Sequence, residues 1–228
     1  MKNNSSTIPN PSSEAAPEPV PPILPASIAP IKISFKEQQF KVREDVILDV
    51  VTRLLASKGF DLMTMDEVAH EVGMAKASLY KHFDSKEVLA AAAMARMLDR
   101  TIERVTALSA SNKKPIDKLK AIVKWSIEKH LTGDMPLLPS TRSTIRQALM
   151  AYSPYVERLT RVSEQLGNWI TEAQTAGHLS DKLPAELVLY TVFARACDPV
   201  ADFMKLSGAY SDEEIVGLLI ATCFDGLG

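Results

Sequence analysis

From residue 36 onward, apolar residues recur with the period of an α-helix, and apolar and polar residues nowhere keep alternating as they would in strands. Glycine and proline residues interrupt this pattern at intervals that separate one helix from the next. The sequence therefore predicts an all-α protein of about nine helices. We expect them at residues 38–58, 64–73, 75–83, 84–108, 115–132, 139–150, 154–176, 184–206 and 211–226.

The composition restricts the classes of protein that fit. A chain of 228 residues, 46% of them hydrophobic, is long enough to bury a core, and its formal net charge of −2 means that any contact with nucleic acid needs a local basic patch. No apolar stretch reaches the roughly 18 to 20 residues that span a bilayer. The histidines and the two cysteines, Cys197 and Cys223, lack metal-ligand spacing, so we expect reduced thiols, no metal and no cofactor.

Residues 1–35 differ in composition from the rest of the chain. Residues 1–30 hold eight of the fourteen prolines, a single lysine and no continuous apolar segment of the kind found in export signals. Such a segment buries too little apolar surface to fold, which predicts a disordered arm. An interaction arm or a tail that touches DNA is the alternative.

A helix-turn-helix is predicted at residues 64–83. Thr64 and Glu67 have the spacing of a capping box, in which the hydroxyl and the carboxylate both satisfy free backbone N–H groups. Gly73 ends this short helix, and the next one, from about Ala75, carries Leu79 inward. Two short helices joined by a tight turn with glycine are typical of the helix-turn-helix motif.

The second helix of such a motif lies in the major groove, so its outer face must reach phosphates and base edges. That face offers Lys76, Ser78, Tyr80, Lys81 and His82. Lys86 follows in the first turn of the helix that Asp84 is expected to cap, where a cation opposes the helix dipole. A bound phosphate would explain this lysine, and a solvated lysine that only keeps the surface soluble is the alternative.

Three segments, 64–69, 73–83 and 85–89, together resemble the signature of TetR-family transcriptional regulators. The resemblance covers about residues 41–95 and implies a DNA-binding domain at 36–85 and a helical effector-binding and dimerisation domain at 86–228. It also implies DNA contacts, which would come from Thr64, Lys76, Ser78, Tyr80, His82 and Lys86. Ala77 and Ala75 replace a frequent glycine and serine of the family, and the change at Ala75 puts one base contact in doubt.

The last two predicted helices are apolar around most of their circumference and need neighbours on more than one side. The resemblance implies a homodimer joined by a four-helix bundle of these helices, and the alternative is that they close only the core of the monomer. Arg195 and Asp198 interrupt the apolar run, and Pro199 is expected to kink the helix. The two charged residues either pair with each other or across the interface, or they face an effector cavity.

The resemblance implies a cytoplasmic, ligand-responsive regulator, a repressor that leaves a palindromic operator on the bacterial nucleoid when a small effector binds. The candidate residues of the effector pocket are aromatic or apolar in the main, which favours a lipophilic or aromatic effector; they are Trp125, His130, Met135, Tyr152 and Trp169. No nucleophile–base pair or phosphate loop points to an enzyme. A non-DNA-binding helical adaptor or an enzyme on the same fold is the alternative.

Overall fold

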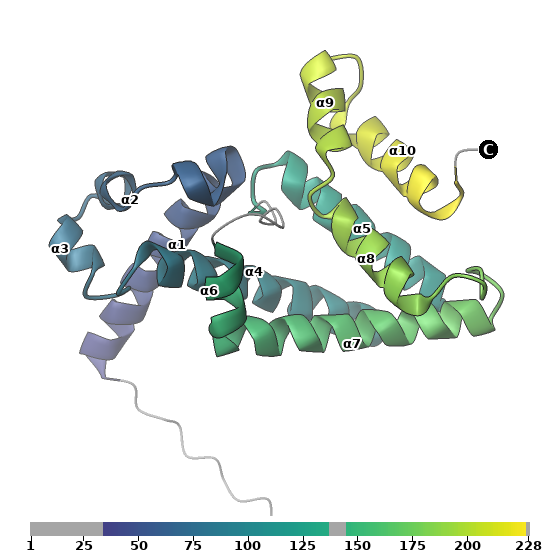
Figure 1. Ribbon diagram of the computed structural model, residues 1–228, viewed down its shortest axis with the longest axis horizontal. Helices are drawn as coiled ribbons and strands as arrows, with labels where there is room; N and C mark the ends of the chain where they lie inside the picture. The colour runs from purple at the N-terminus through teal and green to yellow at the C-terminus, as the bar shows by residue number, and fades with distance from the viewer. Residues whose placement is uncertain (1–33, 137–144, 227–228) are drawn as a thin grey trace, which may run out of the picture. The chain divides into compact units, whose positions relative to one another are not determined.

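The computed structural model describes residues 34–136 and 145–226, and in these residues all regular secondary structure is helical (Figure 1). The described helices are α1 Phe35–Leu62, α2 Met65–Val72, α3 Lys76–Leu79, α4 Lys86–Ser109, α5 Pro115–Leu131, α6 Ile145–Ala151, α7 Ser153–Thr175, α8 Ala185–Arg195, α9 Pro199–Ser207 and α10 Asp212–Phe224. The predicted arm, apart from Ser34 and Phe35, and the predicted helical residues 139–144 lie outside the described residues.

Ten helices occupy the described residues, where the sequence predicted about nine, because the predicted helix 184–206 is divided into α8 and α9. Pro199 stands at the first position of α9, where its missing N–H costs nothing. Asp198 caps α9 by accepting a hydrogen bond from the Val200 amide at 3.0 Å, and it also pairs with Arg195. The pairing of the two charged residues is therefore confirmed, and so is the interruption at Pro199.

Helix α1 extends beyond its predicted bounds at both ends, across a break at Gly59. Gly59 has a φ of 75°, which a residue without a side chain adopts at little cost, and it lets Phe60 fold back into the core. The first valines of α1, Val42 and Val46, are 62% and 46% exposed. The buried stripe begins only at Ile47, because the first turns of α1 run past the helices that cover the rest.

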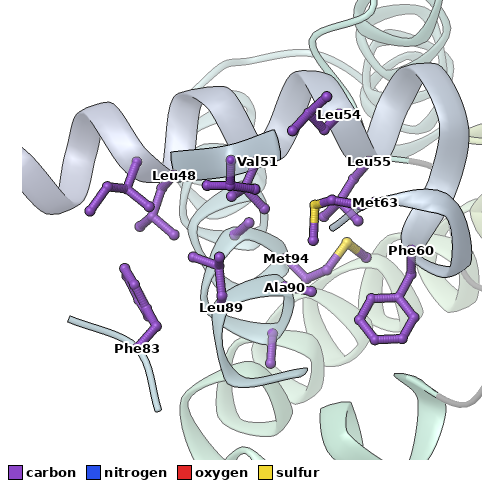
Figure 2. Packing of buried hydrophobic residues seen from close by; sticks show 14 of the residues in the cluster. Leu48, Val51, Leu54, Leu55, Phe60, Met63, Phe83, Leu89, Ala90 and Met94 are labelled. Carbon is purple, nitrogen blue, oxygen red and sulfur yellow. The ribbon is translucent and has the colours of Figure 1, made fainter. Parts of the chain in front are cut away.

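One core cluster joins α1 to α4 and the helix-turn-helix (Figure 2). Leu48, Val51 and Leu55 of α1 face Leu89 and Met94 of α4. Next to the fully buried Leu89, α4 contributes three small buried residues to this cluster: they are Ala90, Ala91 and Ala93. Alanine lets two helix backbones approach closely, so α4 holds the helix-turn-helix against α1 at short range.

A second core cluster uses residues farther along α4 together with residues of α5, α7, α8 and α10. Helices α4 and α7 lie side by side and contribute to both clusters, with Tyr155 of α7 in the first and Leu166 in the second. The two clusters are thus built on one pair of helices. A displacement of α4 at one cluster must be felt at the other, because close-packed interiors transmit strain.

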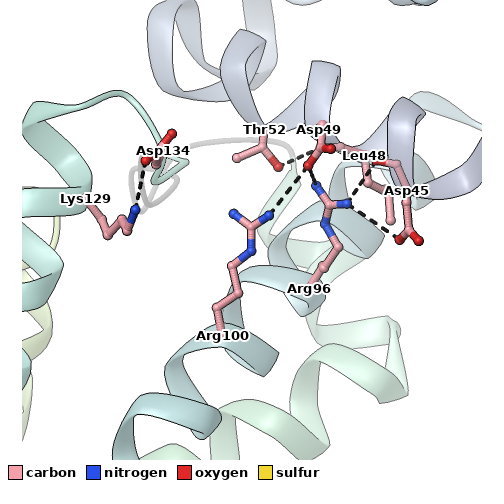
Figure 3. Close-up of polar contacts among 8 residues, drawn as sticks. All are labelled: Asp45, Leu48, Asp49, Thr52, Arg96, Arg100, Lys129 and Asp134. Atoms are coloured by element: carbon pink, nitrogen blue, oxygen red, sulfur yellow. Dashed lines mark hydrogen bonds and ion pairs between the residues drawn. The ribbon is translucent and has the colours of Figure 1, made fainter. Parts of the chain in front are cut away.

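Ion pairs also connect α1 to α4 on the surface (Figure 3). Arg96 donates to the Asp49 carboxylate at 2.5 Å and to the Asp45 backbone carbonyl at 2.9 Å, and Arg100 lies 3.5 Å from the same Asp49 carboxylate. Asp45 and Asp49 are one helical turn apart on α1, as are Arg96 and Arg100 on α4. This matched spacing fixes how α1 and α4 lie along each other.

Candidate DNA-binding site and internal cavity

Thr64 caps α2 as predicted: its hydroxyl oxygen accepts a hydrogen bond from the Glu67 amide at 3.2 Å. The second half of the predicted capping box is wrong. The Glu67 carboxylate does not return to the cap but forms an ion pair with Lys58 at the end of α1. This pair ties α2 to α1, which a local capping interaction would not do.

The turn between α2 and α3 depends on Gly73. Its φ of 75° and ψ of 34° lie in the left-handed region, and its amide donates to the carbonyl groups at the end of α2. The Met74 amide then donates to the Ala69 carbonyl at 2.9 Å. A side chain at position 73 would be strained in this conformation, so the glycine fixes the angle at which α3 leaves the turn.

Helix α3 is short, but its turns continue through Phe83. The Phe83 amide donates to the Leu79 carbonyl at 3.1 Å, and the amides of Tyr80 to His82 make similar contacts. Leu79 is fully buried and Phe83 nearly so, as predicted. With one face of the segment fixed inside the core, the opposite face is presented outward.

Lys76, at the start of α3, is an exposed cation held by an ion pair. Its ammonium group donates to the Asp66 carboxylate of α2 at 2.8 Å. This hydrogen bond is the main reason that the pKa of Lys76 is raised above its usual value, so the side chain stays protonated. Both side chains are well exposed, which leaves Lys76 free to exchange Asp66 for another anion.

The other predicted contact residues of the outer face are at least partly accessible. Thr64, Tyr80 and Lys81 are exposed, and Ser78 is half-buried beside the turn. Hydroxyl groups and a cation at these positions can donate to phosphate oxygens or to base edges. The structure therefore leaves this part of the predicted set accessible at the surface of the helix-turn-helix.

His82 lies apart from this surface. Its ring stacks on Phe40 of α1 with centroids 4.0 Å apart, and its side chain is only 5% exposed. Nδ1 lies 3.7 Å from a Glu44 carboxylate oxygen and has no hydrogen-bond partner in the described residues. The predicted role of His82 in holding the DNA backbone does not match this position, because Phe40 and the rest of α1 cover the ring.

Ser85, rather than the predicted Asp84, caps α4: its hydroxyl oxygen accepts from the Val88 amide at 3.1 Å. Lys86 stands in the first turn of α4, and its ammonium lies 4.3 Å from the centre of the Phe60 ring and 3.4 Å from the Asp61 carbonyl oxygen. The chain itself thus supplies partners for a cation at the unfavourable end of a helix.

An internal cavity of about 90 Å³ lies among α4, α5, α7 and α8. Of the residues proposed for an effector pocket, Trp125 and Met135 line this cavity; the wall also holds Met94, Met97, Thr101, Ser126, Tyr155 and Cys197. The hydroxyls of Thr101 and Ser126 donate to carbonyls of their own helices, at 3.0 and 2.8 Å. None of the described residues in the wall is charged, so they offer a ligand almost pure hydrocarbon surface.

The other three predicted pocket residues do not line this cavity. His130 Nε2 lies 2.9 Å from an Asp202 carboxylate oxygen and joins α5 to α9. Tyr152 packs against the first core cluster, and Trp169 is buried in the second. The sequence analysis did not name Met94, Met97 and Thr101 as pocket candidates, although their spacing places them on one face of the predicted helix 84–108.

Two further searches cover the described residues only. In residues 34–136 and 145–226, no three His, Cys, Asp or Glu side chains gather in a way that would hold a metal ion. None of the helices described there has both the length and the apolar character to cross a lipid bilayer.

The fold and the outer face of α2 and α3 define the class: an all-α protein with an N-terminal helix-turn-helix and a C-terminal helical domain around a cavity. Residues 47–93 match the family model for bacterial regulatory proteins of the tetR family. The helix-turn-helix segment of this chain is thus similar to that of the TetR family, as the sequence indicated.

Two curated transcriptional regulators are similar over the N-terminal part. AlkX of Mycobacterium tuberculosis is 30% identical over 88 residues, which are 38% of this chain and 42% of AlkX. The negative regulator of the biofilm operon, IcaR of Staphylococcus aureus, is 48% identical over 44 residues, 19% of this chain and 24% of IcaR. The chain therefore spans less than half the length of these relatives.

A solved structure resembles nearly the whole described fold. FadR of Bacillus subtilis, in complex with stearoyl-CoA, superposes with a TM-score of 0.62 at 18% identity, covering 81% of this chain and 99% of FadR. At this level of identity the likeness establishes the shared fold. The C-terminal helices of this chain thus share the fold of that structure.

Proposed function

We propose that this protein is a ligand-responsive transcriptional regulator, a repressor that binds a palindromic operator as a homodimer. The observation that carries this proposal is the geometry of α2 and α3. Leu79 is anchored in the core, while Thr64, Lys76, Tyr80 and Lys81 are each exposed on the helix-turn-helix. Its place of action would be the bacterial nucleoid.

DNA contacts are assigned to residues that a duplex can reach. We retain Thr64, Lys76, Ser78, Tyr80 and Lys81, and we leave out His82 because Phe40 covers it. Lys76 would exchange Asp66 for the DNA, and Lys86 would swing from the Phe60 ring to a phosphate. Both exchanges are cheap, because an exposed ion pair and an exposed cation–π contact each contribute at most about 1 kcal/mol.

The dimer surface is assigned to the C-terminal helices. Leu187 and Tyr190 of α8 and Leu218 of α10 are about half exposed, and Phe203 and Leu206 of α9 are 70% and 82% exposed. Monomeric proteins rarely leave so many large apolar side chains together in water. A second copy of the chain would cover them, and the two helix-turn-helix units would then read two half-sites of one operator.

The effector is assigned to the cavity beside α4. A cavity of about 150 Å³ holds one benzene molecule, so a larger ligand must first displace side chains from this smaller one. Met94, Met97 and Met135 are flexible enough to yield. The charge-free wall favours an aliphatic or aromatic group, and FadR in complex with stearoyl-CoA makes a long-chain acyl-CoA a suitable first probe.

Selection of bound genomic fragments by the full chain tests the DNA-binding function. We expect a palindromic motif to be enriched, and the Lys76→Ala variant to lose discrimination at one position of each half-site. If no duplex is retained at low salt in the absence of an effector, the proposal is wrong.

Release of the selected operator by stearoyl-CoA tests the effector site. Ala196→Phe would fill the cavity and should abolish release while leaving DNA affinity unchanged. Ala107→Phe, on an exposed part of α4, is the matched control and should release normally. Equal release from both variants would place the effector elsewhere.

A further inference from the structure

Most cations that the sequence nominated for DNA binding already have partners inside the protein. Lys76 is paired with Asp66, and Lys86 lies over Phe60. In residues 36–85 acidic side chains outnumber basic ones, so a DNA-binding surface here needs cations that are both free and well placed.

Arg43 of α1 is such a cation. It is exposed and takes part in no ion pair or hydrogen bond that the structure places among the described residues, and Lys36, Lys41 and Lys81 share this property. Of these four, Arg43 lines a groove between α1 and the turn of the helix-turn-helix. Its guanidinium group therefore stands beside the start of α3, although α1 is not the helix that reads the bases.

The groove has apolar and hydroxyl-bearing residues in its wall as well as the cation. Val42 and Val46 of α1 form one side with Arg43, and Gly73, Ala75 and Ser78 form the other. The two valines are exposed apolar side chains that the core does not use. The wall thus combines a cation, a hydroxyl and methyl groups within one short channel next to the recognition segment.

From this arrangement we propose that the groove is a seat for one sugar-phosphate strand of the operator, with Arg43 as its phosphate-binding residue. Arginine binds phosphate through two parallel hydrogen bonds, Ser78 can donate a further one, and the valine methyl groups face the apolar side of deoxyribose. This inference rests on the proposed DNA-binding function. It adds a contact from α1, outside the helix-turn-helix itself.

The test is the salt dependence of binding by the full chain to a mixed-sequence duplex, because a phosphate contact does not depend on sequence. The Arg43→Ala variant should bind about tenfold more weakly at low salt, the effect of losing one hydrogen bond to a charged group. The plot of log association constant against log salt concentration should become less steep, by about 0.9 in slope for each protomer bound. Arg43→Lys should keep the parental slope, since it keeps the charge.

The matched control is Arg104→Ala, which removes from α4 an exposed cation that lies outside the groove and has no ion pair or hydrogen bond among the described residues. It should retain the parental slope, and circular dichroism should show equal helix content in all variants because alanine favours helix. A parental slope in Arg43→Ala, with the parent binding DNA, would overturn this inference alone. A parent that binds no duplex at all would overturn the proposed function and the inference with it.

Discussion

Asp49 of α1 accepts a hydrogen bond from Arg96 of α4 at 2.5 Å, and this contact joins the DNA-binding domain to the helix that lines the cavity (Figure 3). Arg96 is largely shielded, whereas Asp49 is more than half exposed. The pair therefore connects α4 to α1, so that a ligand beside α4 can act on α1. The apolar packing of the same two helices is the second such connection.

A double-mutant cycle of Asp49→Ala and Arg96→Ala should give a coupling free energy of about 0.2 to 1 kcal/mol in unfolding, because exposed pairs contribute little. Arg96→Ala should cost more than Asp49→Ala, since Arg96 also binds the Asp45 carbonyl. Chemical denaturation measures all three variants. A coupling energy of zero would mean that the two side chains do not hold α1 to α4 in solution.

Replacing His82 with phenylalanine should leave DNA affinity unchanged and the free energy of unfolding equal or higher. The substitution keeps the stacking on Phe40 and removes a buried Nδ1 that has no hydrogen-bond partner in the described residues. His82→Ala should lower the free energy of unfolding by about 1 to 3 kcal/mol through lost packing. Weaker DNA binding by a stable His82→Phe protein would restore the role that the sequence suggested.

Glutamate at Leu187 or Leu218 should convert the protein into a monomer. Both side chains are about half exposed on the apolar surface of α8 and α10, and a buried unpaired carboxylate would cost several kcal/mol at an interface. Sedimentation velocity measures the mass of each variant. Met150→Glu, on a similarly exposed residue of α6, is the control and should remain a dimer. A dimer in all three variants would place the interface on another surface.

Asp134 provides a prediction about pH. The hydrogen bond from Lys129 is the main cause that lowers the pKa of its carboxyl group, and Thr132 adds a second one. Because the pKa of Asp134 is lower in the folded state, its ionised carboxylate stabilises the folded state at any pH above the unfolded-state pKa, near 3.8. This stabilisation is lost as the pH falls through the pKa of the folded state. In Lys129→Ala the pKa of Asp134 should rise toward 3.8, as NMR titration would record. Thr132→Ala should raise it less, and an unchanged pKa in Lys129→Ala would contradict the assignment.

The helix-turn-helix was predictable because its signals are local. The Thr64 cap and the Gly73 turn act within a few residues, and burial of Leu79 follows from helical spacing. The choice between Asp84 and Ser85 as the cap of α4 was not predictable in this way. Both are good caps one residue apart, and only the path of the chain decides between them.

The positions that the sequence placed wrongly depend on contacts between distant segments. His82 is covered because α1 begins early enough for Phe40 to reach it. His130 and Trp169 were candidates for the pocket. In the structure His130 contacts Asp202, and Trp169 packs in the second core cluster. Composition shows that such side chains are apolar or aromatic, and it does not show which cavity, if any, they face.

Met94 belongs both to the core beneath the helix-turn-helix and to the wall of the cavity, one turn after the closely packed alanines of α4. If α4 were cut at any point, the helix-turn-helix domain and the C-terminal helical domain would not both keep a complete hydrophobic core. Chimaeras that graft a foreign sensor onto this protein should therefore transplant α4 whole, together with the face of α1 that it touches.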